Sequence, residues 1–121
     1  MIGIGNDIIE IDRMRKSIER HGHHFLNRLF TVAEQDYCFK FKDAAPHFAG
    51  RFAAKEAIVK SLGVGFGSEI VWHDVEIINA DNGKPEVILS TFVQKKFSNP
   101  QILVSISHCE KFATAVAIRV K

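Results

Sequence analysis

The sequence has little of what marks several classes of protein. Its 121 residues include two cysteines, Cys38 and Cys109, and three prolines. Two cysteines are too few for a disulfide-built scaffold, and their spacing does not say whether they pair. No apolar run approaches the roughly 20 residues that a membrane-spanning helix needs. These absences argue against a small disulfide protein and against a membrane protein.

An excess of charge of one sign is also lacking. Lysine and arginine number 16 against 14 acidic residues, so the formal net charge is +2. This balance argues against a nucleic-acid module that relies on a strongly basic field, although it allows a local basic patch. The first ten residues, MIGIGNDIIE, carry acid and no basic stretch, unlike a secretory signal peptide. We therefore expect a cytoplasmic protein.

Hydrophobic residues, by contrast, are plentiful. They make up 46% of the chain and include ten phenylalanines, against one tryptophan and one tyrosine. A chain of this length buries roughly two-thirds of its unfolded surface, so it can form a hydrophobic core without disulfides or structural metals. It is too short for two domains of ordinary size. We expect one domain over residues 1–121 with an aromatic and aliphatic core.

Capping signals divide the first half of the chain mainly into helices. Thr31 and Glu34 have the spacing of a capping box, and Asp12 is a candidate N-cap. Pro46 suits the first turn of a helix, and Gly63 suits a helix C-terminus. The expected elements are a strand over 1–11, helices over 12–20 and 24–30 on either side of Gly22, a helix over 31–42 and a central helix over 46–62.

The second half of the chain changes to strand patterns. Asn82-Gly83 is a turn signal between two short apolar runs, DVEII and PEVIL. The runs QILVSISH and FATAVAIRV predict two further strands joined by a short turn. The expected elements are strands over 74–78, 85–89, 101–108 and 112–120, with a helix over 91–97. Together these elements predict an α+β fold: a mainly antiparallel sheet packed with a long central helix.

Asp7 is a carboxylate in an isoleucine-rich strand, directly after the stretch Gly3-Ile4-Gly5. Glycine inside a strand indicates a bulge or the close approach of another group. An unpaired buried carboxylate is costly, so Asp7 must meet water, a basic partner or a cation. Paired with Glu56 it would form an oxygen site suited to Mg²⁺. The alternative is a turn aspartate in a salt bridge.

Two columns of side chains at i, i+4 spacing run along the central helix. One contains Phe52, Glu56 and Lys60, and the next contains Arg51 and Lys55. The like charges of the second column repel each other, and an external anion lying across them and Lys60 would relieve that repulsion. The alternative is a solvated face on which Glu56 and Lys60 form an ordinary ion pair.

Three other motifs are weaker. The run GVGFG over 63–67 follows a helix and lacks the Lys-Ser/Thr of a phosphate loop, so a helix C-terminus with a turn is favoured. His21, His23 and His24 have no partners at metal-ligand spacing, which favours a solvated loop over a zinc site. His108 and Cys109 are adjacent on a strand and point to opposite faces, which argues against a thiol nucleophile.

Two segments together resemble the paired signatures of the 4′-phosphopantetheinyl transferases, and in particular their short bacterial class. The first signature is G-x-D, here GND over 5–7 within GIGNDIIEIDR. The second is F/W-x-x-K-E-x-x-x-K, here over 52–60 within FAGRFAAKEAIVKSLGVG. Three further stretches, WHDVEI, NGKPEVIL and VSISHCEKFATAVAI, are similar to the family. The resemblance therefore covers nearly the whole chain in order.

The resemblance implies transfer of phosphopantetheine from coenzyme A to a serine of apo acyl carrier protein, in support of fatty acid biosynthesis. The other product is adenosine 3′,5′-bisphosphate. The resemblance also implies Mg²⁺ as the metal and a homotrimer with active sites between subunits. Two departures, Asn6 where apolar residues are frequent and Cys109 where polar residues are common, do not change this expectation.

The same resemblance implies roles for individual residues. Asp7 and Glu56 fall on metal-binding and catalytic positions, and Lys60 on a catalytic one. The coenzyme-binding positions are Arg51, Lys55, Lys60, Gly63 and His108. The carrier-protein-binding positions are Arg13, Arg20 and Phe25. Whether the serine proton passes to Glu56 or to a water on the metal stays open.

Two other classes of function use the same residues. A metal-dependent phosphohydrolase or nuclease would use Asp7 and Glu56, and it would act without a carrier protein. A non-catalytic nucleic-acid module would use Arg51, Lys55 and Lys60, and its binding would depend steeply on salt. The near-neutral charge argues against the second of these.

Overall fold

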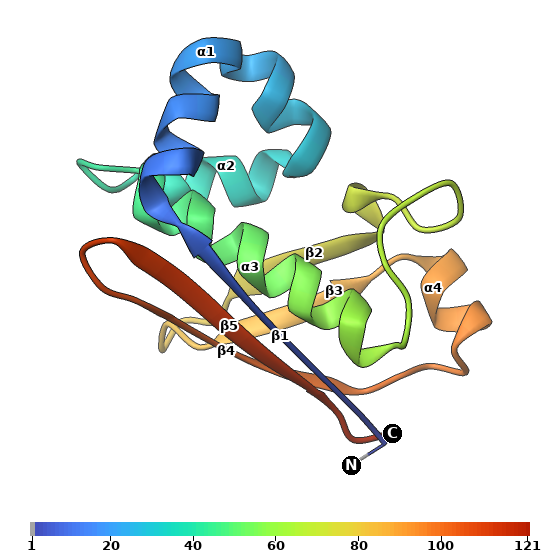
Figure 1. Cartoon of the computed structure of the whole chain (residues 1–121). Coiled ribbons are helices and arrows are strands. Elements are labelled where there is room, and N and C mark those ends of the chain that lie inside the picture. Colours follow the sequence, from blue (N-terminus) through green and yellow to red (C-terminus); the bar gives the residue numbers. More distant parts are fainter. Residues whose placement is uncertain (1) are drawn as a thin grey trace.

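The computed structural model describes residues 2–121, so Met1 of the expected first strand lies outside the described residues. Two antiparallel sheets and the helices that pack against them make up the fold (Figure 1). In chain order the elements are β1 (Gly3–Glu10), α1 (Ile11–Leu29), α2 (Val32–Cys38), α3 (Ala45–Ser61), a 3₁₀ turn (Trp72–Asp74), β2 (Val75–Asn79), β3 (Pro85–Leu89), α4 (Thr91–Lys96), β4 (Ile102–His108) and β5 (Phe112–Arg119).

The helix α3 is the element on which the others are assembled. The larger sheet has the strand order β1-β5-β4, and β2 and β3 form a separate hairpin. The helix α3 packs against all three strands of the larger sheet, with the hairpin on its other side, while α1 and α2 cover its N-terminal end (Figure 1). The first and last strands are neighbours, so the two ends of the described chain lie close together.

Small residues let β1 and β5 lie unusually close to α3. A side chain on Gly3 would collide with the backbone oxygen of Ser61, and one on Gly5 with that of Ala57. The neighbouring strand presents three buried alanines to the helix, namely Ala113, Ala115 and Ala117. The glycines expected to permit close approach therefore do so, and Asp7, on the same face of β1, is held beside α3.

The opposite face of this sheet is exposed and carries hydrophobic side chains among polar ones. Side chains alternate between the two faces of a strand, so the residues between the buried ones point away from α3. The exposed hydrophobic side chains of this outer face are Ile4, Ile8, Leu103, Phe112 and Val116. The larger sheet thus has a close-packed inner face and an uncovered hydrophobic outer face.

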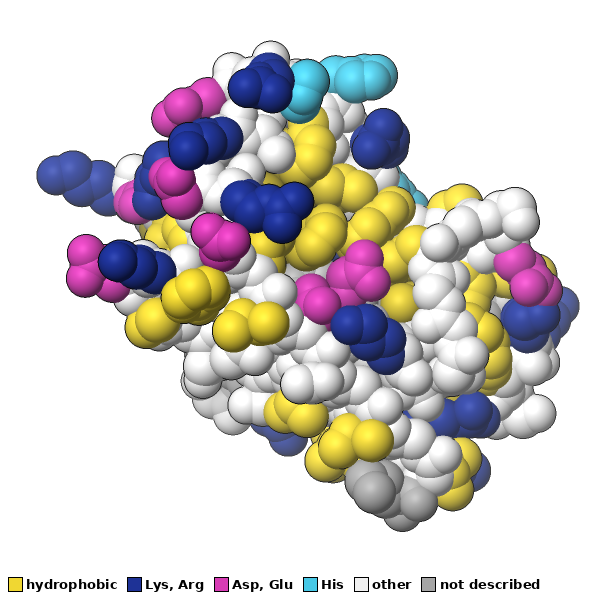
Figure 2. Space-filling model, in the orientation of Figure 1, with side chains coloured by type: hydrophobic (Ala, Val, Ile, Leu, Met, Phe, Trp, Pro, Cys, Tyr) yellow, Lys and Arg dark blue, Asp and Glu magenta, His cyan; other side chains and the backbone are white. Residues whose placement is uncertain are grey.

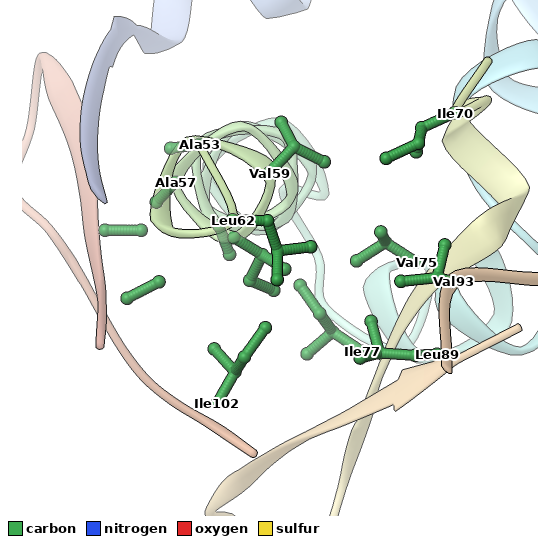
Figure 3. Close-up of a cluster of buried hydrophobic side chains, with 14 residues drawn as sticks. Ala53, Ala57, Val59, Leu62, Ile70, Val75, Ile77, Leu89, Val93 and Ile102 are labelled. Atoms are coloured by element: carbon green, nitrogen blue, oxygen red, sulfur yellow. The ribbon is translucent and has the colours of Figure 1, made fainter. Parts of the chain in front are cut away.

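Two hydrophobic clusters stabilise the fold, and α3 contributes to both. The larger cluster lies between α3, the strands and the loop before β2, where Leu62, Ile77 and Ile102 point toward one another (Figure 3). The second joins α1, α2 and the start of α3 around Phe30 and Phe48, whose ring centroids are 5.0 Å apart. Fully burying such an aromatic side chain contributes about 1.5–3 kcal/mol.

The α+β architecture and most helix boundaries are as the sequence predicts. The Thr31–Glu34 capping box is present: Glu34 N donates to Thr31 Oγ1 at 3.2 Å, and Thr31 N donates to Glu34 Oε1 at 2.9 Å. Gly63 ends α3 with φ at 80°, and its N–H donates to Lys60 O. Gly83, also at positive φ (85°), forms the expected turn between β2 and β3.

Two boundaries differ from the expectation. Asp12 is not an N-cap, because the N–H of Ile11 still pairs with Lys111 O at 2.9 Å and the helix follows the strand directly; Asp12 lies in the first turn and pairs with Lys16 at 3.1 Å. The helix α2 ends at Cys38 rather than at residue 42, since the N–H groups of Lys40 and Phe41 bond three residues back in tight turns.

The two short helices expected on either side of Gly22 form one element, α1, that is kinked there. Gly22 has φ 56° and ψ −138°, a conformation that breaks the helix and suits glycine. Within residues 2–121, no helix combines the length and the apolar character that crossing a bilayer requires.

Candidate active site

Asp7, Glu56 and Lys60 meet where β1 crosses α3. Asp7 points toward the helix from the inner face of β1, and Glu56 and Lys60 lie one turn apart on α3. The Lys60 ammonium is 3.1 Å from Asp7 Oδ1 and donates to the backbone oxygen of Asn6 at 3.0 Å. The salt bridge expected as one alternative for Asp7 therefore exists, and it forms next to a second carboxylate.

The two carboxylates affect each other. Partial burial raises the pKa of Glu56, the negative charge of Asp7 raises it further, and Lys60 acts in the opposite direction. Two acids that repel each other beside one lysine form a site at which an added cation is stabilised. No hydrogen bond within the described chain involves the Glu56 carboxylate, so its oxygens are available to a ligand.

The donor set fits Mg²⁺ rather than a metal that needs a protein cage. Residues 2–121 contain no cluster of three or more His, Cys, Asp or Glu side chains arranged for a metal. Mg²⁺ usually takes only one or two protein carboxylates and completes its shell with phosphate oxygens and waters. Asp7 and Glu56 supply the oxygen ligands for such a site, which would be completed by a phosphorylated substrate.

A cavity of about 500 Å³ opens beside these acids, and we call it the carboxylate cavity. Asp7 and Glu56 line it on one side, and Arg13, Phe25 and Phe52 line it on another. The ring of Phe52 is fixed by stacking on Trp72, with centroids 5.0 Å apart. On the face drawn in Figure 2, acidic, basic and hydrophobic side chains meet below α1. The cavity thus joins a metal-type site to a partly apolar docking surface.

A second cavity, of about 430 Å³, lies between the start of α3, the end of β4 and the β2–β3 turn, and we call it the histidine cavity. Its titratable lining residues are Tyr37, His47, Arg51, Lys84 and His108. No aspartate or glutamate is among the described residues that line it. A pocket with this lining is suited to an anion.

Arg51 is buried in the wall of the histidine cavity. Its side chain is 4% exposed, its guanidinium lies 4.1 Å from the centre of the Tyr37 ring, and Nη2 donates to Asn79 Oδ1. Asn79 in turn donates to Gly83 O at 2.9 Å. The Nε of Arg51 is buried without a hydrogen-bond partner in the described chain, so one donor of this guanidinium is unsatisfied.

Lys55 lies elsewhere, and the expectation of three helix cations on one anion-binding face is wrong for this residue. Its side chain is fully buried; Nζ donates to Glu34 Oε1 at 2.7 Å and to Leu29 O at 2.8 Å. Glu34 also accepts from the N–H of Ile77 at 2.9 Å. Burial lowers the pKa of Lys55, and the facing Glu34 opposes that effect. Lys55 therefore ties α3 to the end of α1 and to α2 instead of facing an external anion.

The remaining predicted residues lie at the margins of these cavities. Arg20 and Arg13 line one shallow depression of about 200 Å³ on α1. Gly63 terminates α3, three residues beyond Lys60. Asp7, Glu56, Lys60, Arg13 and Phe25 are thus brought together, whereas Arg51 and His108 share the other cavity.

The two cysteines lie in different surroundings. Cys38 is buried, and burial raises its pKa to about 12. Cys109 is exposed at the β4–β5 turn, where Sγ lies 3.7 Å from Phe112 O. Both thiols are free. The histidines of the HGHH stretch are exposed on α1 and belong to no metal cluster in the described residues.

A family model for the 4′-phosphopantetheinyl transferase superfamily matches residues 3–117. The holo-[acyl-carrier-protein] synthase of Protochlamydia amoebophila is 56% identical over 97% of this chain and 96% of its own length. The chain belongs to the 4′-phosphopantetheinyl transferase superfamily. The synthase of Chlamydia pneumoniae, a further similar transferase, is 51% identical over 98% of this chain and 96% of its own.

Solved structures of transferases agree with this assignment. Helicobacter pylori holo-[acyl-carrier-protein] synthase, solved in complex with coenzyme A, gives a TM-score of 0.88 at 38% identity, over 96% of this chain and 98% of that one. The Neisseria meningitidis synthase gives 0.90 at 28% identity over the whole of both chains. The fold expected from the resemblance is confirmed.

The sequence interpretation missed two residues that line the histidine cavity, His47 and Lys84. His47 precedes Arg51 by one helical turn, so i, i+4 spacing was an available signal for it. Lys84 follows the Asn82-Gly83 turn, and nothing in its local sequence indicates that the hairpin folds back toward α3.

Proposed function

We propose that this chain is a holo-[acyl-carrier-protein] synthase that transfers 4′-phosphopantetheine from coenzyme A to a serine of apo acyl carrier protein, in support of fatty acid biosynthesis. The observation that carries the proposal is the meeting of Asp7, Glu56 and Lys60 beside a cavity that also presents Arg13 and Phe25. The relatives named above bear the same activity in their names. The cytoplasmic location expected from the sequence stays a prediction.

Phosphoryl transfer needs charge neutralised on the phosphate oxygens and the attacking oxygen held in line, with little covalent work by the protein. Asp7 and Glu56 would hold Mg²⁺, which when bound supplies Lewis-acid stabilisation of the pyrophosphate. Lys60, beside Asp7, would stabilise negative charge on the same phosphates. The raised pKa of Glu56 in the metal-free protein reflects burial and the repulsion of Asp7, and a bound cation would relieve that repulsion.

The carrier protein would dock on α1. Acyl carrier proteins are acidic, and the first half of α1 presents Arg13 and Arg20 on one side. Phe25 forms part of the hydrophobic wall of the carboxylate cavity, only a short distance from the acids that would hold the metal. A carrier held by the arginines would therefore place its serine at the mouth of that cavity.

We also propose that the active unit is a homotrimer. Among residues 2–121 the carboxylate cavity and the histidine cavity share no lining residue, yet both kinds of site suit different phosphates of one coenzyme molecule. A neighbouring subunit that places its histidine cavity opposite the carboxylate cavity would complete the site. The uncovered hydrophobic outer face of the larger sheet offers a surface for such packing.

The transfer itself is tested by the mass of apo acyl carrier protein after incubation with coenzyme A and Mg²⁺. A gain of one phosphopantetheine per carrier, with release of adenosine 3′,5′-bisphosphate, is expected. Turnover of coenzyme A without any carrier protein would contradict the proposal and favour a phosphohydrolase.

The trimer is tested by light scattering during dilution, with activity followed in parallel. Ile4→Asp and Val116→Asp, on the outer face, are expected to shift the mass toward that of the monomer and to reduce the rate, because each buries a charge in an apolar interface. Val32→Asp, at an exposed position on α2, is the matched control. A monomeric mass with full activity would exclude composite sites.

A further inference from the structure

His47 lines the histidine cavity, and ring stacking fixes its side chain there. Its ring stacks on Phe41, with centroids 3.5 Å apart and an angle of 13° between the planes. On its other side it meets the His108 ring edge-on at a centroid distance of 5.4 Å. His47 belongs to α3 and His108 to the end of β4, so two histidines from distant parts of the chain face the same space.

The charges around His47 are unbalanced. His108 faces it from β4, Arg51 from the next turn of α3 and Tyr37 from α2, and Lys84 shares the cavity from the hairpin turn. Among residues 2–121, the acid that acts on it is Asp43, in the loop before α3. Both oxygens of Asp43 are already held by Arg15, at 2.7 and 3.0 Å. The groups that face His47 are therefore mainly cationic or able to become so.

This surrounding favours the neutral form of His47 in the absence of a ligand. Burial lowers its pKa, and His108 and Arg51 lower it further, while Asp43 opposes them. A dianionic ligand in the cavity would reverse the balance, because it attracts the positive charges that otherwise repel one another. Binding of such a ligand would then be coupled to uptake of a proton.

We propose that His47 is a binding residue for a phosphate monoester of the coenzyme and takes up a proton when that group enters the histidine cavity. The inference rests on the proposed function, in which coenzyme A is the substrate. That molecule carries its phosphates as a pyrophosphate and as a separate monoester. The pyrophosphate suits the carboxylates and Lys60, which leaves the cation-lined cavity for the monoester.

The stack on Phe41 makes His47 the better placed of the two histidines for this coupling. His108 is exposed at the strand end, whereas His47 is half-buried and cannot turn away from the cavity without losing the stack. Because the imidazole is already fixed, little side-chain conformational entropy is lost when it contacts the ligand. Arg51 also lines the cavity and gives the same phosphate a positive charge that does not titrate near neutral pH.

The experiment is calorimetric titration with adenosine 3′,5′-bisphosphate at several pH values, in buffers of different ionisation enthalpy. We expect the wild type to take up protons on binding and to bind more weakly as pH rises, by up to about tenfold per pH unit for each proton taken up. His47→Phe keeps an aromatic ring against Phe41 but cannot titrate, and His47→Gln provides a second non-titrating variant. His23→Gln, at an exposed position on α1, is the control.

Both His47 variants are expected to take up fewer protons and to lose about tenfold in affinity at pH 6, and to approach the wild type above pH 8. The affinity for coenzyme A without its 3′-phosphate should depend on pH equally in the wild type and in the His47 variants. Equal proton uptake in the wild type and both variants would overturn the inference while leaving phosphopantetheinyl transfer intact. Failure of the bisphosphate to bind at any pH, together with no transfer from coenzyme A, would overturn both.

Discussion

The carboxylate cavity and the histidine cavity are built on the same helix and have opposite chemistry. Lys60 and Glu56, near the C-terminal end of α3, meet Asp7 in a place where a cation is favoured. Arg51 and His47, near its N-terminal end, form a place where an anion is favoured. This difference means that α3 does not present a single phosphate-binding face. Different parts of a substrate that carries both a metal-binding pyrophosphate and a phosphate monoester would suit the two ends.

The largest effect is expected from removing the acids of the first cavity. Asp7→Asn or Glu56→Gln should reduce kcat/KM by at least about 100-fold, because several kcal/mol of charge stabilisation at the transition state would be lost. The rate of phosphopantetheine transfer at saturating Mg²⁺ measures this. Asp12→Asn, in the exposed first turn of α1, is the control. A near-normal rate with an unchanged Mg²⁺ requirement would contradict the metal assignment.

Local signals predicted much of this arrangement. The capping box at Thr31, the proline at the start of α3 and Gly63 at its end set boundaries that the structure confirms. The alternation along β1 turns Asp7 to the same face as Gly5, so the close approach of α3 was also readable. These features depend on residues a few positions apart, which is the range over which sequence patterns are informative.

The buried position of Lys55 could not be predicted from such local patterns. Its spacing from Arg51 suggested a shared face, but its partner Glu34 is 21 residues away and on another helix. Only the packing of α2 against α3 decides that the Lys55 ammonium points inward. The same holds for His47 and His108, which are brought together by the return of β4 to the start of α3.

Lys55 belongs to neither cavity, so its substitution separates an effect on stability from an effect on either cavity. Glu34→Gln or Lys55→Met should lower the free energy of unfolding by about 3–5 kcal/mol, since each leaves a buried charge without its partner. Urea denaturation measures this loss. Lys60→Met is the matched control: its pair with Asp7 is partly exposed, so it should affect stability little and turnover strongly. Equal stability of the Lys55 and Lys60 variants would contradict the buried-pair role.

A smaller effect is expected where the carboxylate cavity meets the carrier protein. Arg13→Glu should raise KM for acyl carrier protein by about tenfold and KM for coenzyme A much less, because a charge reversal repels an acidic partner. The wild-type rate should also fall as salt rises, since exposed charges are screened. Steady-state kinetics with each substrate varied in turn measures both. Arg28→Glu, in the last turn of α1, is the control, and equal effects on both substrates would exclude docking at Arg13.

The smallest expected effect is a shift in the titration of Glu56, and it tests whether the carboxylates interact as the structure indicates. Burial and the charge of Asp7 raise the pKa of Glu56, and Lys60 opposes them. Asp7→Asn removes a negative neighbour, so the Glu56 pKa should move down toward its ordinary value. Lys60→Met removes a positive neighbour, so the pKa should move up. NMR titration of the Glu56 side-chain carboxyl in metal-free protein measures both shifts. Because the two substitutions act with opposite sign, a general loosening of the fold cannot imitate the pair of results, whereas shifts in the same direction would mean that Asp7 and Lys60 do not both face Glu56 in solution.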